Sequence, residues 1–356
     1  MHFGSDNVVG ASDPVMQAII AANSGAMPSY GEDDIAARVT RKLCDIFERE
    51  VRVMLLASGT AANGLALACL TPPWGEVFCH AEAHVMTDEC GGPEHWTGGA
   101  KLTPIAGVGG KIDPSELEAA LAAPRRGVHS VKPAALSLTN LSECGMRYSA
   151  EETRTLAALA RTRGLKVHMD GARFTNALVG GTESAADLTW KAGVDVLCLG
   201  ATKNGALAAE AVVFFDPALA ETASHRRMRG GHLLSKGRLL SAQMEGWLAD
   251  DHWLALARRA NQAAARLAKG FAKVHGIRLA WPVEGNEVFI ILPTWLEQDL
   301  LEAGFRFYRW KTSSIARKNA PRENEAVCRL VCSWQTEGAD IDALIKVASD
   351  ASAAGR

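Results

Sequence analysis

The sequence has eight cysteines but no Cys-x-x-Cys pair, and its histidines and cysteines nowhere share the spacing of a metal site. We therefore expect no metal ion. Several cysteines lie inside apolar runs, which is typical of buried thiols in a protein of the reducing cytoplasm. A Gly-x-Gly-x-x-Gly motif after the first predicted strand is also missing, and this argues against a dinucleotide-binding domain.

Membrane and nucleic-acid functions lack support as well. The chain begins without a basic segment followed by an apolar core, so we expect no secretory signal, and no stretch is long and apolar enough to span a bilayer. The formal net charge of -2 gives no reason to expect nucleic acid or a membrane as a partner. These features agree with a soluble cytoplasmic enzyme.

The chain is long enough for two domains, with 356 residues of which 48% are hydrophobic. Helical and strand patterns alternate from about residue 15 to 215, as expected for βαβ units in a mostly parallel sheet. An amphipathic helix is predicted over 251–275. We predict an α/β fold with a large domain at 1–250, including the N-terminal segment, and a smaller α+β domain at 251–356. The small domain should contain strands at 278–281, 288–292, 305–308 and 327–331 and helices near 295–302 and 340–352.

Lys203 is the most informative residue. It follows the apolar stretch 194–200 and lies in a loop of small residues beside the hydroxyl of Thr202. A lysine just beyond a buried strand is partly desolvated, so its amine can form a Schiff base with an aldehyde cofactor. Taken alone, Lys203 could also be an ordinary solvated loop lysine.

Asp170 makes the functional interpretation more specific. It follows a second short apolar run, and Gly171 and Arg173 come next. In an open α/β sheet, ligands bind outside the carboxyl ends of the strands, so Asp170 and Lys203 can meet at one crevice. Pyridoxal phosphate needs such a pair, because the carboxylate keeps the pyridine nitrogen protonated while the lysine holds the aldehyde. A helix N-cap would explain Asp170 alone, but not the pair.

A third feature is the segment 55–63, an apolar strand that turns through Gly59 into a run of helix-forming residues. The backbone N–H groups of Gly59 and Thr60, the hydroxyls of Ser58 and Thr60, and the helix dipole would together hold a phosphate dianion. The same residues could form an ordinary helix cap. The order of phosphate loop, aspartate and lysine along the chain is the more specific signal.

These motifs, with others along nearly the whole chain, resemble the low-specificity L-threonine aldolases of the aspartate-aminotransferase-like superfamily, in the bacterial branch that also cleaves phenylserine-type substrates. The matching segments are 5–7, 30–33, 58–63, 83–84, 87–91, 168–174, 202–205 and 329–334. The resemblance implies the fold type I architecture of pyridoxal phosphate enzymes, with a seven-stranded-type sheet between helices. It also implies retro-aldol cleavage of L-3-hydroxy-α-amino acids, such as L-threonine, L-allo-threonine and phenylserine, to glycine and an aldehyde, and the reverse addition.

Site residues of the family can be carried over to the matching positions. The resemblance implies that Lys203 binds the cofactor aldehyde, that Asp170 pairs with the pyridinium nitrogen and that Arg173 lies close to the ring. His84 is expected to stack over the cofactor and to take the β-hydroxyl proton, with Asp88 one helical turn further on. Without the resemblance, His84 could be a capped or core histidine.

The substrate carboxylate is expected to contact Ser5 and Arg329, and Tyr30 is expected to reach the site from an adjoining subunit. The resemblance therefore implies a homo-oligomer, a tetramer or at least a dimer, with shared sites. Arg329 also has an independent interpretation, because the strand period of two places it on the opposite face from Cys328 and Leu330. A lone arginine in such a strand needs an anion, although a surface arginine on an edge strand is the alternative.

The sequence departs from the family at two places. Leu141 and Ser142 stand where many members have a second histidine, so the preference between threo and erythro substrates stays open. His129 could serve instead, or could have no role in the site. The family's phosphate contact from the neighbouring subunit falls in a Gly-Gly-rich segment, where Lys236 or Arg229 could supply it.

Two other functions are compatible with this scaffold. A β-eliminating lyase would release pyruvate, and an aminotransferase would accept an oxo acid. A catalytically silent relative acting as a binding or structural subunit is a third possibility, but the intact Lys203, Asp170 and His84 argue against it.

Overall fold

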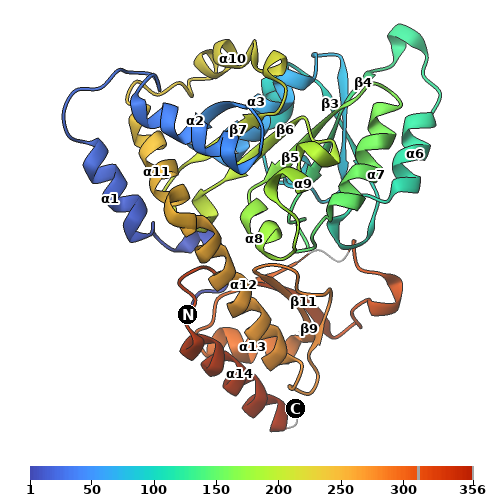
Figure 1. Ribbon diagram of the computed structural model, residues 1–356. Coiled ribbons are helices and arrows are strands. Elements are labelled where there is room, and N and C mark those ends of the chain that lie inside the picture. Colours follow the sequence, from blue (N-terminus) through green and yellow to red (C-terminus); the bar gives the residue numbers. More distant parts are fainter. Residues whose placement is uncertain (311–312, 355–356) are drawn as a thin grey trace.

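The computed structural model describes residues 1–310 and 313–354, and it has the predicted α/β architecture (Figure 1). A seven-stranded sheet of order β1-β7-β6-β5-β4-β2-β3 forms the centre of the large domain. Strands β3, β2, β4, β5 and β6 are parallel, and β7 runs antiparallel to both of its neighbours. The strands are β1 (Arg52–Leu56), β2 (Gly75–His80), β3 (Lys101–Ile105), β4 (Lys132–Thr139), β5 (Lys166–Gly171), β6 (Val196–Gly200) and β7 (Glu210–Phe214).

Helices cover both faces of this sheet. Successive side chains of a strand point to opposite faces, so Val212 and Phe214 of β7 pack with α3, while Ala211 and Val213 pack in the core on the other side. Because both faces are buried, the strands read as continuous apolar runs. The helices are α1 (Asp13–Ala22), α2 (Asp34–Ile46), α3 (Gly59–Leu70), α4 (His84–Thr87), α5 (Gly92–Thr97), α6 (Pro114–Ala122), α7 (Ala150–Arg161), α8 (Phe174–Val179), α9 (Ala185–Leu188), α10 (Ala223–Arg229) and α11 (Arg238–Leu248).

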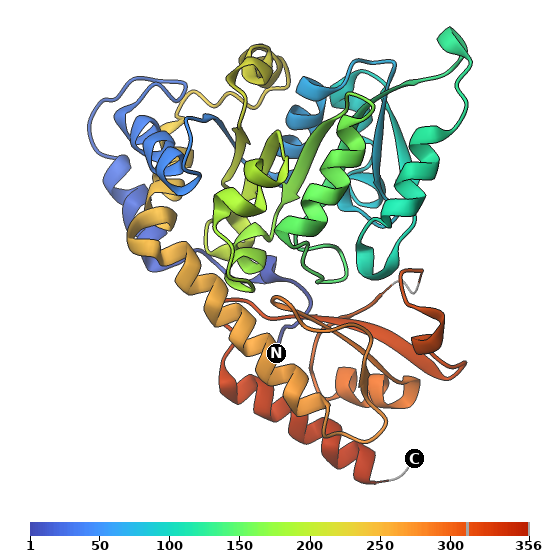
Figure 2. The same ribbon diagram turned by 45° about the vertical axis from the view of Figure 1, so that its right-hand side comes forward.

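The small domain contains a four-stranded antiparallel sheet of order β10-β11-β9-β8, whose apolar side chains share one core with three helices. Helix α12 continues from the large domain into the small one (Figure 2). It ends at Phe271, a turn earlier than predicted. The elements are α12 (His252–Phe271), β8 (Arg278–Leu279), β9 (Glu287–Pro293), α13 (Thr294–Glu302), β10 (Tyr308–Arg309), β11 (Glu325–Val331) and α14 (Gly338–Ala353).

The N-terminal segment, which we predicted as part of the large domain, begins in the small one. Phe3 is buried in the small-domain core, where its N–H donates to the carbonyl of Arg306 (2.7 Å) and its carbonyl accepts from Val331 (2.7 Å). This pairing also explains why the strand predicted at 305–308 starts only at Tyr308, since the backbone of Arg306 bonds to the N-terminal segment instead.

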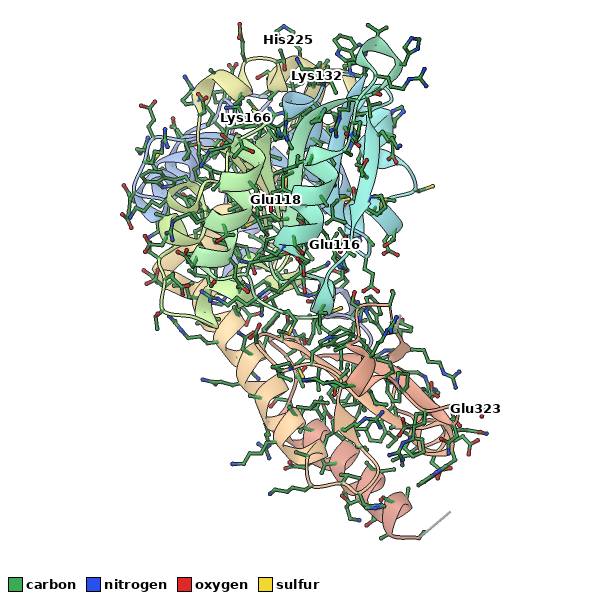
Figure 3. The ribbon with its side chains drawn as sticks, turned by 90° about the vertical axis from the view of Figure 1, so that its right-hand side faces the viewer. Glu116, Glu118, Lys132, Lys166, His225 and Glu323 are labelled. Carbon is green, nitrogen blue, oxygen red and sulfur yellow. The ribbon has the colours of Figure 1, made fainter. Side chains whose placement is uncertain are left out.

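The carboxyl ends of the parallel strands point toward the small domain. Lys132 and Lys166, the first residues of β4 and β5, lie at the end of the sheet away from the small domain in Figure 3. The crevice expected beyond the strand ends therefore lies near the junction of the domains. Among the described residues, no helix combines the length and apolar character that crossing a membrane requires.

Candidate active site

Lys203, Asp170 and the predicted phosphate loop line one cavity of about 450 Å3 at the carboxyl ends of the strands. Of the other predicted site residues, His84, Arg173 and Thr202 also line it. The expected convergence of distant segments is therefore present in the fold.

The phosphate loop is the N-terminus of α3. Ser58 is its N-cap, and its Oγ accepts from the N–H of Ala61 (3.3 Å), which fixes the turn between β1 and the helix. A Cβ added to Gly59 would meet no atom within 4 Å, so the space in front of the helix end is open. The unpaired N–H groups and the positive end of the helix dipole face this space, and a phosphate dianion fits there.

Asp170 is held by two donors at the end of β5. Its Oδ1 accepts from the N–H of Ala172 (3.0 Å), and its Oδ2 accepts from Nδ2 of Asn63 (2.9 Å), which lies one turn into α3. The carboxylate is buried and also lines the cavity. This arrangement suits a carboxylate that must stay ionised beside a pyridinium nitrogen.

His84 begins α4, and its Nδ1 lies 2.8 Å from Oε1 of Glu89. Because a carboxylate can only accept, Nδ1 carries the proton and Nε2 is left to accept one. The hydrogen bond to Glu89 raises the pKa of His84, and burial raises the pKa of Glu89. Asn63 donates to the same oxygen of Glu89 (2.8 Å) and so links His84 to Asp170.

Asp88 lies one helical turn after His84, as predicted, since its N–H donates to the carbonyl of His84 (2.9 Å), but its side chain does not line the cavity. Helix α4 is only four residues long, so Asp88 is its C-cap, where it is exposed and accepts from the hydroxyl of Thr87 (2.5 Å). The chain then turns at Cys90 with φ of 51°, and Glu89 is the residue that faces inward. Glu89, which directly follows Asp88, is therefore the acid that pairs with the imidazole of His84.

Lys203 and Thr202 lie in the short 3-10 helix η5 (Thr202–Asn204), directly after β6. The hydroxyl of Thr202 donates to Oε1 of Glu210 (2.5 Å), the first residue of β7. Burial raises the pKa of Glu210 to about 7, although the charge of Lys203 lowers it. Sequence reasoning missed Glu210, and the available signal was an acidic residue directly before the apolar run 211–215.

Arg173 forms a buried charge cluster with two acidic residues beside the cavity. Its Nε and Nη2 donate to the two oxygens of Asp6 at 2.8 and 3.1 Å, and its Nη2 lies 3.4 Å from Glu287. Burial alone would raise the pKa of Asp6, but the charges of Arg173 and Lys203 and the hydrogen bonds from Arg173 and Asn286 together hold that pKa below its usual value. Sequence reasoning did not find these two acids, because they come from segments far from Arg173.

Arg329 adjoins the same cluster. Its Nη1 lies 3.8 Å from Glu287, and its guanidinium lies over the ring of Trp310, 4.2 Å from the centroid. Cys328 and Leu330 point into the small-domain core, so the predicted opposition of the faces is confirmed. Glu287 is an anion near Arg329, and β11 lies between β10 and β9, so the alternative of a surface arginine on an edge strand is wrong.

Ser5 and His129 do not line the cavity. Ser5 caps the 3-10 helix η1 (Asp6–Val8) by accepting from the N–H of Asn7 (3.1 Å), and Asn7 rather than Ser5 lines the cavity. His129 ends the exposed 3-10 helix η3 (Gly127–His129) just before β4. It is therefore at the amino end of the strand, whereas the cavity is at the carboxyl end, and its suggested role as the second histidine is wrong.

Tyr30 and Lys236 are also outside this cavity. Tyr30 is 49% exposed in the loop before α2, and it lines a separate depression together with Leu234. Lys236 is exposed in the loop before α11. Neither residue lines the cavity of its own chain.

Glu143 and Leu141 line the cavity after β4, where many family members have the second histidine. The turn is held by Asn140, whose side chain bonds twice to the backbone of Tyr148. Burial raises the pKa of Glu143. This position thus offers an acid in place of an imidazole.

His84, Glu89 and Asp170 each place a potential metal ligand within 4.8 Å of one another. Asn63, however, donates to both carboxylates. His84 also pairs with Glu89, so the three groups already have partners in one another and in Asn63, and we assign no metal to them.

A family model described as beta-eliminating lyase matches residues 2–293. The chain belongs to the beta-eliminating lyase family. Its relatives in this family include the low-specificity L-threonine aldolase of Pseudomonas aeruginosa, 40% identical over 98% of this chain and 96% of the relative. The enzyme of the same name from Pseudomonas sp. strain NCIMB 10558 is 39% identical over 96% of this chain and 94% of the relative.

Solved structures agree with this family. A threonine aldolase of Leishmania major superposes with a TM-score of 0.90 at 28% identity and covers 99% of both chains. Serine palmitoyltransferase of Sphingomonas wittichii, at 15% identity over 99% of this chain and 87% of the other, has a TM-score of 0.71 and shares the fold. The family, the fold type I architecture and the pyridoxal phosphate-dependent lyase class are therefore confirmed.

Proposed function

We propose that this protein cleaves L-3-hydroxy-α-amino acids to glycine and an aldehyde, and that it also runs the reverse addition. The observation that carries the proposal is the convergence of Lys203, Asp170 and the Ser58–Thr60 loop on one cavity, in a chain of the beta-eliminating lyase family. Pyridoxal phosphate supplies the electron sink that accepts the electrons of the broken Cα–Cβ bond.

The lining of the cavity supports an assignment of the groups that would hold the cofactor. The amine of Lys203 would bind the aldehyde, and the carboxylate of Asp170 would keep the pyridine nitrogen protonated. Asn63 and Ala172 orient that carboxylate through its two oxygens. The N-terminus of α3 binds the phosphate.

We assign His84 as the base that takes the β-hydroxyl proton. Its Nε2 is the accepting atom, because Nδ1 donates to Glu89. A positioned base of this kind contributes roughly 10²–10⁴ in rate. The raised pKa of His84 strengthens it as a proton acceptor.

For the substrate carboxylate we propose Arg173 and Arg329, with Ser5, which does not line the cavity itself but directly precedes Asp6, the acid that Arg173 binds. Arg173 lines the cavity, and Arg329 adjoins it through Glu287. Guanidinium groups bind a carboxylate in a bidentate fork, which would fix the bond that stands perpendicular to the cofactor ring.

We further propose a cytoplasmic homotetramer, or at least a dimer, in which Tyr30 and Lys236 complete the site of a neighbour. Their exposure and their position outside the cavity of their own chain support shared sites. Five cysteines are buried as free thiols, which is typical of a protein that folds in a reducing compartment. They are Cys79, Cys144, Cys198, Cys328 and Cys332.

Aldehyde release from L-threonine, L-allo-threonine and L-phenylserine tests the function directly, with glycine quantified in the same reaction. Equimolar aldehyde and glycine are expected, and the three rates rank the substrates. Pyruvate, or consumption of an oxo acid, would instead identify β-elimination or transamination. The description of the family as beta-eliminating lyases makes these the controls to include.

A further inference from the structure

Glu210 is a buried acid that the proposed reaction does not use. It is 6% exposed and lines the same cavity as Lys203 and the phosphate loop. Its strand register pairs it with Leu56 at the end of β1 and with Gly200 at the end of β6. Because β1 leads into the phosphate loop and β6 leads into the Lys203 segment, Glu210 stands between these two parts of the site.

The hydrogen bonds of Thr202 show that Glu210 acts as an acceptor in the empty site. The Thr202 hydroxyl donates to Oε1 of Glu210 (2.5 Å) and accepts from the N–H of Ala209 (3.1 Å). A hydroxyl has a single proton. With that proton committed to Glu210, Thr202 has no donor left for an anion in the cavity.

An ionised Glu210 would also repel a phosphate dianion in the neighbouring loop. A protonated Glu210 removes this repulsion and becomes a donor itself. It can then donate to Oγ1 of Thr202, whose own proton can turn toward the phosphate, a stronger acceptor than the carbonyl of Ala209 at 3.4 Å.

We propose that Glu210 is ionised in the empty site and takes up one proton from solvent when a phosphate dianion binds at the N-terminus of α3. The hydrogen bond between Glu210 and Thr202 then reverses, and Thr202 donates to the phosphate. This inference rests on the proposed function only in taking that helix end as the phosphate site of the cofactor.

The groups around Glu210 allow it to gain or lose a proton near neutral pH. The ionisable groups around it are Lys203 from η5, Asp170 from β5 and the thiol of Cys198 from β6, while Arg227 of α10 donates to the backbone of β1. Burial raises the pKa of Glu210 to about 7, Lys203 lowers it and Asp170 raises it. An added dianion raises the pKa further, so protonation at neutral pH follows.

Binding of pyridoxamine 5'-phosphate tests the proposal, because this compound carries the phosphate but has no aldehyde to react with Lys203. Isothermal titration calorimetry in buffers of different ionisation enthalpy gives the number of protons taken up. At mildly alkaline pH, where Glu210 of the free site is ionised, we expect the wild type to take up close to one proton more than Glu210→Gln. Above the pKa of the free site, the wild-type Kd should rise with pH by up to about tenfold per unit more steeply than the Kd of Glu210→Gln, whose profile reports only the ligand and the other groups of the site.

Glu143→Gln is the matched control, since Glu143 lines the same cavity but follows β4 rather than facing the phosphate loop. It should retain the proton uptake of the wild type. Equal uptake by the wild type and Glu210→Gln overturns the role of Glu210 and leaves the proposed function intact, whereas failure of any pyridoxal compound to bind overturns both. Should Glu210→Gln not fold, a wild-type Kd that is independent of pH overturns the proposal by itself.

Discussion

Lys203 reaches the cavity without a hydrogen bond or ion pair to any residue that the structure describes. The nearby acids interact with Lys203 through their charge alone, and they include Asp6, Glu143 and Glu210. Lys203→Ala should therefore abolish aldehyde release while changing the free energy of unfolding by less than about 1 kcal/mol. Activity assays and urea denaturation check the two halves, and substantial residual turnover would contradict the assignment of the cofactor lysine.

A measured pKa of His84 in variants would show whether Glu89 or Asp88 interacts with its imidazole. Glu89 stabilises the imidazolium, so Glu89→Gln should lower the pKa of His84. A base must be neutral to accept a proton, and the acidic limb of the kcat/KM profile should therefore move to lower pH.

Asp88→Asn is the matched comparison, because Asp88 is the adjacent acid but is exposed to solvent. It should leave the acidic limb where it is in the wild type. A shift in Asp88→Asn without one in Glu89→Gln would reinstate the assignment expected from the sequence.

At the scale of the elements, the position of Asp170 depends on the close approach of β5 and β6. A Cβ on Gly171 would lie 2.6 Å from the carbonyl oxygen of Cys198 and 2.8 Å from Cδ1 of Leu197. Gly171→Ala should therefore cost about 1–3 kcal/mol of stability and weaken cofactor binding by displacing Asp170. The urea midpoint and the Kd for pyridoxal phosphate measure the two effects.

Gly10→Ala provides the control for this substitution, since a Cβ there would meet no atom within 4 Å. Its urea midpoint should match that of the wild type. A stable Gly171→Ala variant with unchanged cofactor affinity would show that the two strands can separate without cost.

The elements themselves were largely predictable. Strands β9 and β11 and helices α13 and α14 lie within two residues of their predicted bounds, because their apolar periodicity is a local property of the sequence. The strand predicted at 305–308 was displaced for a reason that no local pattern contains. Its backbone partner is the N-terminal segment, about three hundred residues away, as the bond from Phe3 to Arg306 shows.

At the scale of the whole molecule, shared sites predict that two inactive variants can restore each other. Tyr30→Ala removes a residue that does not reach its own cavity, and Lys203→Ala removes the cofactor lysine. A mixture of the two after subunit exchange should recover activity, because a hybrid contains sites with both intact residues. No recovery despite confirmed exchange, or an active species at monomer mass in sedimentation, would contradict the shared site.

The sequence alone determined the chemistry of this protein. Lys203, Asp170 and the Ser58–Thr60 loop could be found because each follows an apolar strand, and residue type together with strand position is local information. The family motifs around them supplied the reaction class.

Only the tertiary structure decided the partners of these groups. Glu89 rather than Asp88 contacts His84 because α4 ends after a single turn, and Asp6 neutralises Arg173 because the N-terminal segment crosses between the domains. Glu210 contacts Thr202 because β7 lies antiparallel beside β6. These contacts depend on how separate segments pack, and the protonation of the site depends on the contacts.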